Sequence, residues 1–278
     1  MVMRWPLSLL KSCHLPRKVF QMRRFDVETS FHFPYATFAS AAAFAEFSGD
    51  SQRLFDARYA YEVALARAAR ENSHISPGTC GICLSQTTFS TIIPDAAPHT
   101  ENPEPNWREE QVCACPERLN ARFRAMLQVI DAESGLLPWM RVLVLGASQA
   151  IEQHIDVRVA AMITRRRSGR LQPATEREEA AYHLIVSSEH LHAEPMLQKT
   201  LQSMHAALMP GGKLLFTAPF DARATETRPS RPGAPGVLGW DILDRIERAG
   251  FDSAAAHLFW SEEFGYLGPF NLIFSASA

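Results

Sequence analysis

The stretch from Tyr182 to Phe220, YHLIVSSEHLHAEPMLQKTLQSMHAALMPGGKLLFTAPF, constrains the fold more than any other part of this 278-residue chain. It reads as an apolar strand over 182–188, a polar turn, an amphipathic helix over 195–208, a Pro-Gly-Gly turn and a second apolar strand over 213–220. Two buried strands joined through a helix are typical of a parallel crossover. The stretch therefore predicts a doubly wound, Rossmann-like α/β sheet.

The flanking sequence extends this sheet in both directions. RVLVLG at 141–146 and VRVAAMI at 157–163 are expected strands on the N-terminal side. On the C-terminal side a helix is expected over 240–249, closed by Gly250. The last 25 residues contain two strands that are too close together for a helical crossover, so they should form an antiparallel hairpin.

Composition excludes several classes of protein. The chain is 46% hydrophobic and 21% charged, with a net charge of -2, which is typical of a globular protein and gives no general attraction to polyanions. No apolar run approaches the roughly 20 residues of a membrane-spanning helix, and we expect a cytoplasmic protein without membrane contact. The basic, acid-free residues 1–25 are either a poorly ordered tail or a targeting or membrane-surface arm.

Changes in composition divide the chain into three predicted regions. Residues 1–74 hold the basic tail and an Ala-rich helical part, with Ser51 or Asp50 as a helix cap. Residues 75–125 are rich in Pro, Thr, Ser and Cys and predict a loop-rich, zinc-ribbon-like module. Residues 126–278 carry the alternating strands and helices of the Rossmann-like domain.

Four cysteines in the second region form two close pairs. They lie in TCGIC and VCACP, at Cys80, Cys83, Cys113 and Cys115. Two such pairs brought together can supply four thiolates to a tetrahedral, structural zinc ion. Free or redox-active thiols and disulfides are the alternatives, and His74 or His99 could replace Cys115 as the fourth ligand.

The C-terminal half resembles the class I S-adenosylmethionine-dependent methyltransferases. The resemblance rests on the Glu-His pair in VSSEHLH, on the segment HAALMPGGKLLFTAPF and on GWDILDRIERAGF. Some bacterial methyltransferase-like proteins also carry the cysteine pairs followed by an Arg-rich helix, here ERLNARFRAML. The resemblance implies S-adenosylmethionine as cofactor, contacted by Gly146, Ala147 and Ser148 after the first strand and by Glu189 after the fourth.

The sequence departs from that family where the cofactor binds. The turn after the first strand, LGASQAIE, has a single glycine, and the expected second strand is followed by Arg165–Arg170 instead of an acid. The 35 residues from Ala147 to Ala181 are too few for the family's three crossovers, since each needs at least ~10 to 12 residues. One helix or strand between them must therefore be missing or vestigial.

These observations leave three functions open. The first is a methyltransferase acting on a small-molecule acceptor, with His190 as general base. In this function His192 and Tyr266 would face the substrate, while His183 is expected to be a hydrogen-bonded core residue. The second is a degenerate methyltransferase fold without catalysis, serving as a zinc-stabilised scaffold that binds a protein partner. The third is nucleic-acid binding through the zinc module and Arg165–Arg170, which the near-neutral charge disfavours.

Overall fold

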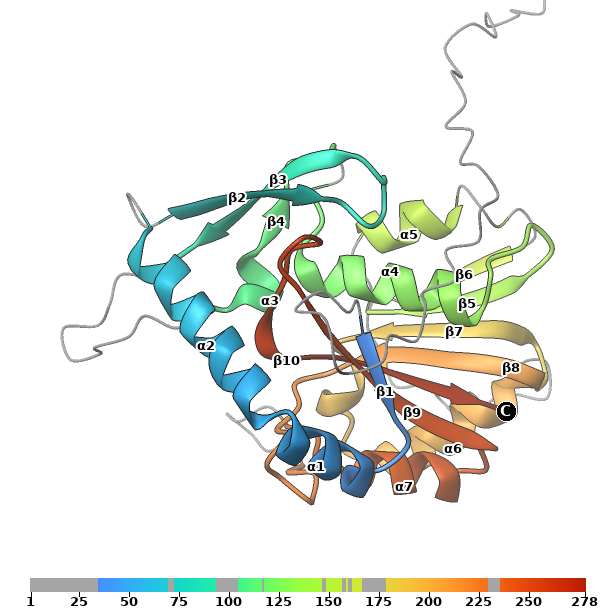
Figure 1. Cartoon of the computed structure of the whole chain (residues 1–278). Helices are drawn as coiled ribbons and strands as arrows, with labels where there is room; N and C mark the ends of the chain where they lie inside the picture. The colour runs from blue at the N-terminus through green and yellow to red at the C-terminus, as the bar shows by residue number, and fades with distance from the viewer. Residues whose placement is uncertain are drawn as a thin grey trace, which may run out of the picture.

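A computed structural model of the chain provides the structure (Figure 1). The parts of the chain that the structure describes are 35–69, 73–93, 105–116, 118–146, 149–156, 159, 162–166, 179–229 and 236–278. Within these ranges no helix combines the length and the apolar character needed to cross a membrane.

The main sheet has seven strands in the order β1-β9-β10-β8-β7-β5-β6. Neighbouring strands among β6, β5, β7 and β8 run parallel, whereas β10 is antiparallel to both β8 and β9, and β1 is antiparallel to β9. The strands span Tyr35–Phe38 (β1), Arg141–Leu145 (β5), Met162–Arg166 (β6), Tyr182–Ser188 (β7), Leu208–Thr217 (β8), Ser253–Ser261 (β9) and Tyr266–Ser277 (β10). The predicted doubly wound sheet with a terminal antiparallel hairpin is confirmed.

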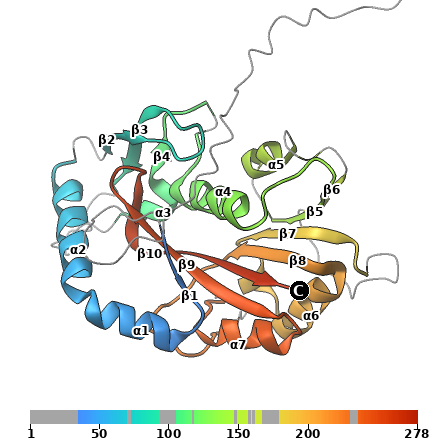
Figure 2. The ribbon, with the colours of Figure 1, turned by 45° about the vertical axis from the view of Figure 1, so that its right-hand side comes forward.

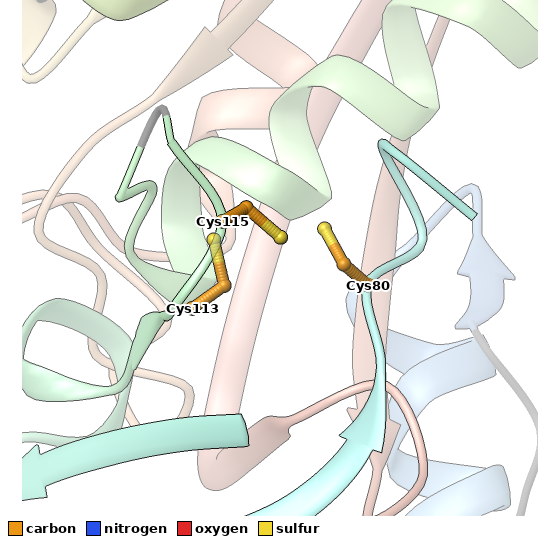
Figure 3. A group of neighbouring side chains, drawn as sticks. All are labelled: Cys80, Cys113 and Cys115. Atoms are coloured by element: carbon orange, nitrogen blue, oxygen red, sulfur yellow. The ribbon is translucent and has the colours of Figure 1, made fainter. Parts of the chain in front are cut away.

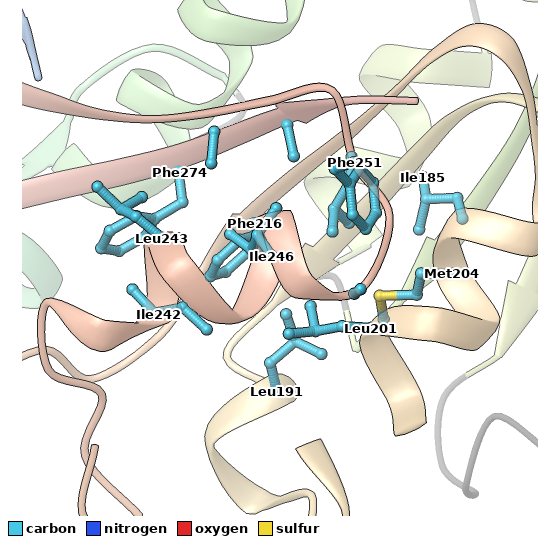
Figure 4. Close-up of a cluster of buried hydrophobic side chains, with 14 of the residues drawn as sticks. Ile185, Leu191, Leu201, Met204, Phe216, Ile242, Leu243, Ile246, Phe251 and Phe274 are labelled. Carbon is cyan, nitrogen blue, oxygen red and sulfur yellow. The ribbon is translucent and has the colours of Figure 1, made fainter. Parts of the chain in front are cut away.

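Helices cover both faces of this sheet (Figures 1 and 2). On one face α4 (Ala121–Glu133) and α5 (Gln149–Asp156) contribute to one buried apolar cluster, and on the other face α6 (Leu197–Ala207) and α7 (Asp241–Arg248) contribute to a second. Figure 4 shows the second cluster, in which side chains of both helices meet Phe216 of β8 and Phe274 of β10. The apolar runs of the strands are buried because helices lie on both sides of them.

The Pro-Gly-Gly segment does not form a separate turn. It lies inside β8, where the pairing with β7 shifts: Tyr182 pairs with Leu208, but Leu184 pairs with Lys213. Gly211, at φ +75°, donates its backbone N–H to the carbonyl of the C-terminal Ala278. The predicted turn is therefore an irregularity within a longer strand, held by backbone hydrogen bonds of Gly211 and Gly212 with Ala278.

The second strand of the Rossmann-like domain also differs from the prediction. It was expected over 157–163, but β6 spans Met162–Arg166 and pairs with β5 from Arg141 to Leu145. Arg165 and Arg166 are therefore part of an edge strand and not of a loop after it. In the described residues, one helix (α5) and one strand (β6) separate β5 from β7, which agrees with the shortened interval.

The cysteine-bearing region is more regular than the predicted loop-rich insert. It forms a three-stranded antiparallel sheet of β2 (Ser73–Thr79), β3 (Gln86–Ile92) and β4 (Val112–Cys113), with the short helix α3 (Trp107–Glu110) before β4. This small sheet packs against the turn of the β9–β10 hairpin, where Thr79 donates its backbone N–H to the Glu263 carbonyl at 2.8 Å. Regular structure is present here because the strands satisfy one another's backbone groups.

The first region contributes to the main sheet as well as to helices. β1 pairs with β9, and α1 (Ala41–Asp50) and α2 (Gln52–Arg67) then run along one end of the strands toward the small sheet (Figure 1). Ser51 is the N-cap of α2, but its side chain makes no capping hydrogen bond there. The division of the chain at residues 74 and 125 stays a prediction.

A buried histidine ties β1 to the hairpin. His257 in β9 is 2% exposed, with Nδ1 3.0 Å from Thr37 Oγ1 and Nε2 2.8 Å from Ser275 Oγ. Burial lowers its pKa to about 4. Its folded-state pKa is therefore below the unfolded value, so the unfolded chain binds the extra proton as the pH falls.

This shift predicts acid sensitivity between pH 6.5 and 4. Over that interval the folded protein should lose about 3 kcal/mol of unfolding free energy through His257 alone. His257→Gln keeps the polar contacts and removes the titration, so its urea-unfolding free energy should fall less between pH 7 and pH 4 than that of the wild type. Equal slopes for the two proteins would contradict the assignment.

Candidate functional site

The order of the sheet strands reverses between β5 and β7. From β5 the chain goes outward to the edge strand β6, and it then returns to form β7 on the other side of β5. In open α/β sheets this reversal leaves a crevice at the carboxyl ends of the two strands, where ligands bind. Here the residues that follow these strands are Gly146 after β5, and Glu189 and His190 after β7.

Gly146 has the conformation expected of a ligand-binding turn. Its φ of +62° lies in the left-handed region that favours glycine. A Cβ atom at this position would lie 2.8 Å from the Ser188 carbonyl oxygen and 3.3 Å from the His190 Cβ atom. Gly146 is exposed to solvent, but on the side that a Cβ atom would occupy it is in close contact with Ser188 and His190. The adjacent Ala147 and Ser148, also expected to bind the cofactor, lie outside the described residues.

Glu189 and His190 lie beside this turn with different partners. Glu189 has a left-handed backbone, at φ +51°, and its N–H donates to the Thr217 carbonyl at 2.9 Å. Its carboxylate accepts a hydrogen bond from Arg108 Nη2 at 2.6 Å. His190 turns its Nε2 toward Glu194 Oε1, 3.1 Å away. The adjacent residues therefore contact separate groups at the same edge of the sheet.

A partly buried ion cluster joins this edge to the cysteine-bearing region. Arg122 of α4 donates from Nη1 to Ser188 Oγ at 2.6 Å, and from Nε and Nη2 to both oxygens of Glu109 at 2.6 and 3.0 Å. Arg108 bonds to Glu109 as well as to Glu189. Two arginines and two glutamates thus alternate at the end of β7. The sequence singled out Arg122 only as part of an Arg-rich helix, and no pattern indicated Arg108 or Glu109.

The other three residues that the sequence analysis assigned, His183, His192 and Tyr266, lie in different surroundings. His183 accepts the expected hydrogen bond, from the Arg141 N–H at 3.0 Å, but it is half-buried and does not belong to the core. His192 lies in the single 3-10 turn after β7, and burial lowers its pKa. Tyr266 is fully buried, and the Arg124 guanidinium lies 5.5 Å from its ring. The expectation that Tyr266 faces a substrate is therefore wrong, because the residue belongs to the core.

Three of the four cysteines of the second region form a cluster, and the fourth lies beside one of them. Sγ atoms of Cys80, Cys113 and Cys115 lie within 4.8 Å of one another, and Figure 3 shows them pointing toward a common centre. The Cys83 Sγ atom is 3.1 Å from that of Cys115, and none of the four forms a disulfide. A hydrogen bond with Cys80 holds the pKa of Cys113 well below its usual range. Disulfide pairing, one of the alternatives, is absent among these four residues.

This donor set is chemically suited to zinc. Thiolates on a tetrahedral zinc ion with Zn–S bonds of about 2.3 Å stand about 3.8 Å apart, which lies below the 4.8 Å limit that holds for Cys80, Cys113 and Cys115. His74 lies at the opposite end of β2 from Cys80, six residues and about 20 Å away, so it does not belong to this cluster. His99 lies outside the described residues. Cys83 lies beside Cys115, but its Sγ atom is not one of the three that all lie within 4.8 Å of one another.

The strand order, the switch point and the terminal antiparallel hairpin define the fold. This is the Rossmann-like fold of the class I S-adenosylmethionine-dependent methyltransferases, with β1 added at one edge and a small antiparallel sheet carrying the cysteine cluster. The resemblance stated from the sequence is thereby confirmed at the level of the fold.

Comparison with known proteins gives partial similarity to solved structures. No family model and no curated protein sequence matches the chain. A solved S-adenosylmethionine-dependent methyltransferase from Mesorhizobium loti is 15% identical, with a TM-score of 0.42, covering 58% of this chain and 100% of that one. The Burkholderia thailandensis 1,6-didemethyltoxoflavin-N1-methyltransferase, solved with 1,6-didemethyltoxoflavin and S-adenosylhomocysteine, is 14% identical, with a TM-score of 0.44, covering 56% and 78%.

A further match covers less of its counterpart. It is a structure named as a sarcosine dimethylglycine methyltransferase from Galdieria sulphuraria, at 16% identity and a TM-score of 0.31. The similar region covers 36% of this chain and 46% of that one, so the chain spans about half the length of this relative.

The ion cluster predicts a position-specific effect of charge removal on α3. Glu109→Gln should lower the unfolding free energy by about 1–3 kcal/mol, because it removes the carboxylate that compensates the buried Arg122. Glu110→Gln, on the same short helix, removes an equal charge outside this cluster and should change stability by less than about 0.5 kcal/mol. Urea unfolding of both variants measures the difference, and equal losses would contradict a specific role of Glu109.

Proposed function

We propose that the protein is an S-adenosylmethionine-dependent methyltransferase that acts on a small-molecule acceptor, with its cofactor site between the ends of β5 and β7. One observation carries the proposal: a left-handed glycine and a Glu-His pair meet at the topological switch point of a methyltransferase-type sheet. The sequence resemblance over VSSEHLH and the segments after it supports the same activity.

In this proposal the chain's own residues supply contacts, orientation and a base. Gly146, Ala147 and Ser148 would let the backbone approach the cofactor, and Glu189, fixed by Arg108, would contact it. When bound, S-adenosylmethionine supplies a methyl group on a positively charged sulfur. His190, with Nε2 beside Glu194, would accept a proton from the acceptor if the acceptor must lose one. Catalysis would consist mainly of alignment and the exclusion of water.

Cofactor binding tests the proposal. Isothermal titration of the zinc-replete protein with S-adenosylhomocysteine should give a micromolar Kd, and Gly146→Leu should abolish the heat because its side chain meets Ser188 and His190. Gly211→Leu is the matched control: its φ is also positive, but nothing lies within 4 Å of an added Cβ. Gly211→Leu should bind like the wild type. Absence of both heat and thermal stabilisation at millimolar ligand would refute the proposed cofactor site.

A second candidate function is a degenerate methyltransferase fold that binds a protein partner without catalysis. Two observations favour it. Strand β6 ends in Arg165 and Arg166, where the family places an acid that binds the ribose, and Glu189 is already engaged by Arg108. The same titration separates the two functions, because only the first requires S-adenosylhomocysteine to bind.

We further propose that Cys80, Cys83, Cys113 and Cys115 hold a structural zinc ion. Four sulfur ligands leave no open coordination position, so the metal would stabilise the fold and take no part in methyl transfer. Its effect would reach the switch point through the chain, since Cys113 follows α3 by three residues and α3 carries Arg108 and Glu109.

Zinc analysis by mass spectrometry tests this proposal. Protein produced with zinc should retain about one ion per chain after dialysis, and Cys113→Ser should lower both the zinc content and the Tm. Cys13→Ser removes the fifth cysteine, which is outside the predicted set, and should keep the zinc. Wild-type protein that holds no zinc, with all four thiols reactive toward a thiol reagent, would favour the free-thiol alternative.

A further inference from the structure

Cys83 differs from the other three cysteines of the second region in its exposure. Cys80, Cys113 and Cys115 are 1%, 1% and 7% exposed, whereas Cys83 is exposed to solvent. It lies in the turn that joins β2 to β3, at residues 80–85. Because the oxidation of a cysteine depends on access to its sulfur, a small oxidant from solvent meets Cys83 before the other described cysteines.

The thiol nearest to Cys83 belongs to a different segment of the chain. The Sγ atoms of Cys83 and Cys115 are 3.1 Å apart, while Cys80 has Cys113 as its main hydrogen-bonding partner. A disulfide bond is about 2.05 Å long, so the sulfurs of Cys83 and Cys115 need to approach by only about 1 Å to be joined. Cys115 is therefore the thiol that is in place to react with an oxidised Cys83.

Backbone hydrogen bonds hold the two segments in this position. In the turn that carries Cys83, the Cys80 N–H donates to the Ser85 carbonyl at 3.0 Å. On the other segment, the N–H of Ala114, the residue before Cys115, donates to the Thr88 carbonyl of β3 at 2.9 Å. The two sulfurs are thus near each other before any oxidation, which lowers the entropy cost of joining them.

We infer that Cys83 and Cys115 form a site of reversible oxidation by hydroperoxides, at which the two thiols become a disulfide. With hydrogen peroxide, the Cys83 thiolate attacks one oxygen: the S–O bond forms, the O–O bond breaks and hydroxide leaves. The Cys115 thiolate then attacks the Cys83 sulfur, so that the S–S bond forms, the S–O bond breaks and a second hydroxide leaves. The two sulfurs lose two electrons, and the peroxide takes up these electrons and the two thiol protons to become two water molecules. Thiol–disulfide exchange with a dithiol restores both thiols.

The disulfide would remove two of the four sulfur ligands proposed for zinc. The two that remain, Cys80 and Cys113, do not make a closed tetrahedral site, so the ion should leave as the disulfide forms. This consequence rests on the proposed zinc site. Formation of the disulfide needs only the two thiols.

Peptide mapping by mass spectrometry under non-reducing conditions tests the inference. Reduced, zinc-replete, full-length wild type is treated with a small molar excess of hydrogen peroxide, and the remaining thiols are alkylated. We expect a linked pair of peptides that contain Cys83 and Cys115, which dithiothreitol separates again. A first disulfide between any other pair of cysteines, a sulfinic acid at Cys83 without the link, or an unoxidised Cys83 at millimolar peroxide would overturn the inference.

Two single substitutions assign the order of the reaction. Cys83→Ser should slow the oxidation of Cys115 by at least about tenfold, because the buried thiol must then meet the oxidant itself. Cys13→Ser removes a cysteine outside the described part of the chain and should leave the rate of Cys83–Cys115 linkage unchanged. Equal rates of Cys115 oxidation in Cys83→Ser and the wild type would contradict Cys83 as the thiol that reacts first. If Cys83→Ser fails to fold, the peptide map of the wild type still decides.

Zinc release, followed with a chromogenic chelator in the same experiment, separates this inference from the zinc proposal. Release should proceed at the rate at which the disulfide forms. Formation of the Cys83–Cys115 disulfide in protein that never held zinc would refute only the zinc proposal. Protein that keeps both its zinc and its thiols under millimolar peroxide would refute only this inference.

Discussion

The contacts of Arg122 hold together parts of the molecule that are distant in sequence. The Arg122 side chain extends from α4. It donates hydrogen bonds to Ser188 at the end of β7 and to both carboxylate oxygens of Glu109 on α3. Arg122 is 7% exposed, and a buried charge without partners is costly in free energy. The positions of Ser188 and Glu109 relative to α4 are therefore constrained. The cysteine-bearing region is thereby fixed to the carboxyl edge of the sheet, where Gly146 and Glu189 lie.

Helix α2 in the N-terminal half also contacts the carboxyl edge of the sheet. Helix α2 places Glu62 against Trp260 and Gly268, at the end of β9 and the start of β10, so the hairpin and the helix share one buried hydrogen-bonded centre. A cavity beside it is walled by the sheet, by α2 and by α3 together. At the switch point, residues from the first 125 positions (Arg108, Glu109 and Arg122) add to the groups that the sheet itself supplies.

Much of the fold could be predicted because apolar runs report burial directly. β5 and β7 and the two strands of the final hairpin lie where the sequence predicts them, since each run is buried between helices or sheet neighbours. The prediction placed β6 several residues too early. Its sequence, MITRR, has no strand periodicity, and the strand is held in the sheet by pairing with β5 alone. β1 and the small antiparallel sheet gave no signal, as their pairing partners lie far away in the chain.

The sequence by itself determined the doubly wound topology, the Glu-His pair after β7, the glycine after β5 and the two cysteine pairs, since each depends on neighbouring residues. Only the tertiary structure decided that Cys80, Cys113 and Cys115 form one cluster with Cys83 beside Cys115, that Tyr266 is core, and that Arg108 and Arg122 link Glu189 to Glu109. The cavity beside α2 also belongs to this second group. Its walls come from helices, loops and strands whose approach is fixed by packing, and packing between distant segments leaves no local pattern in a sequence.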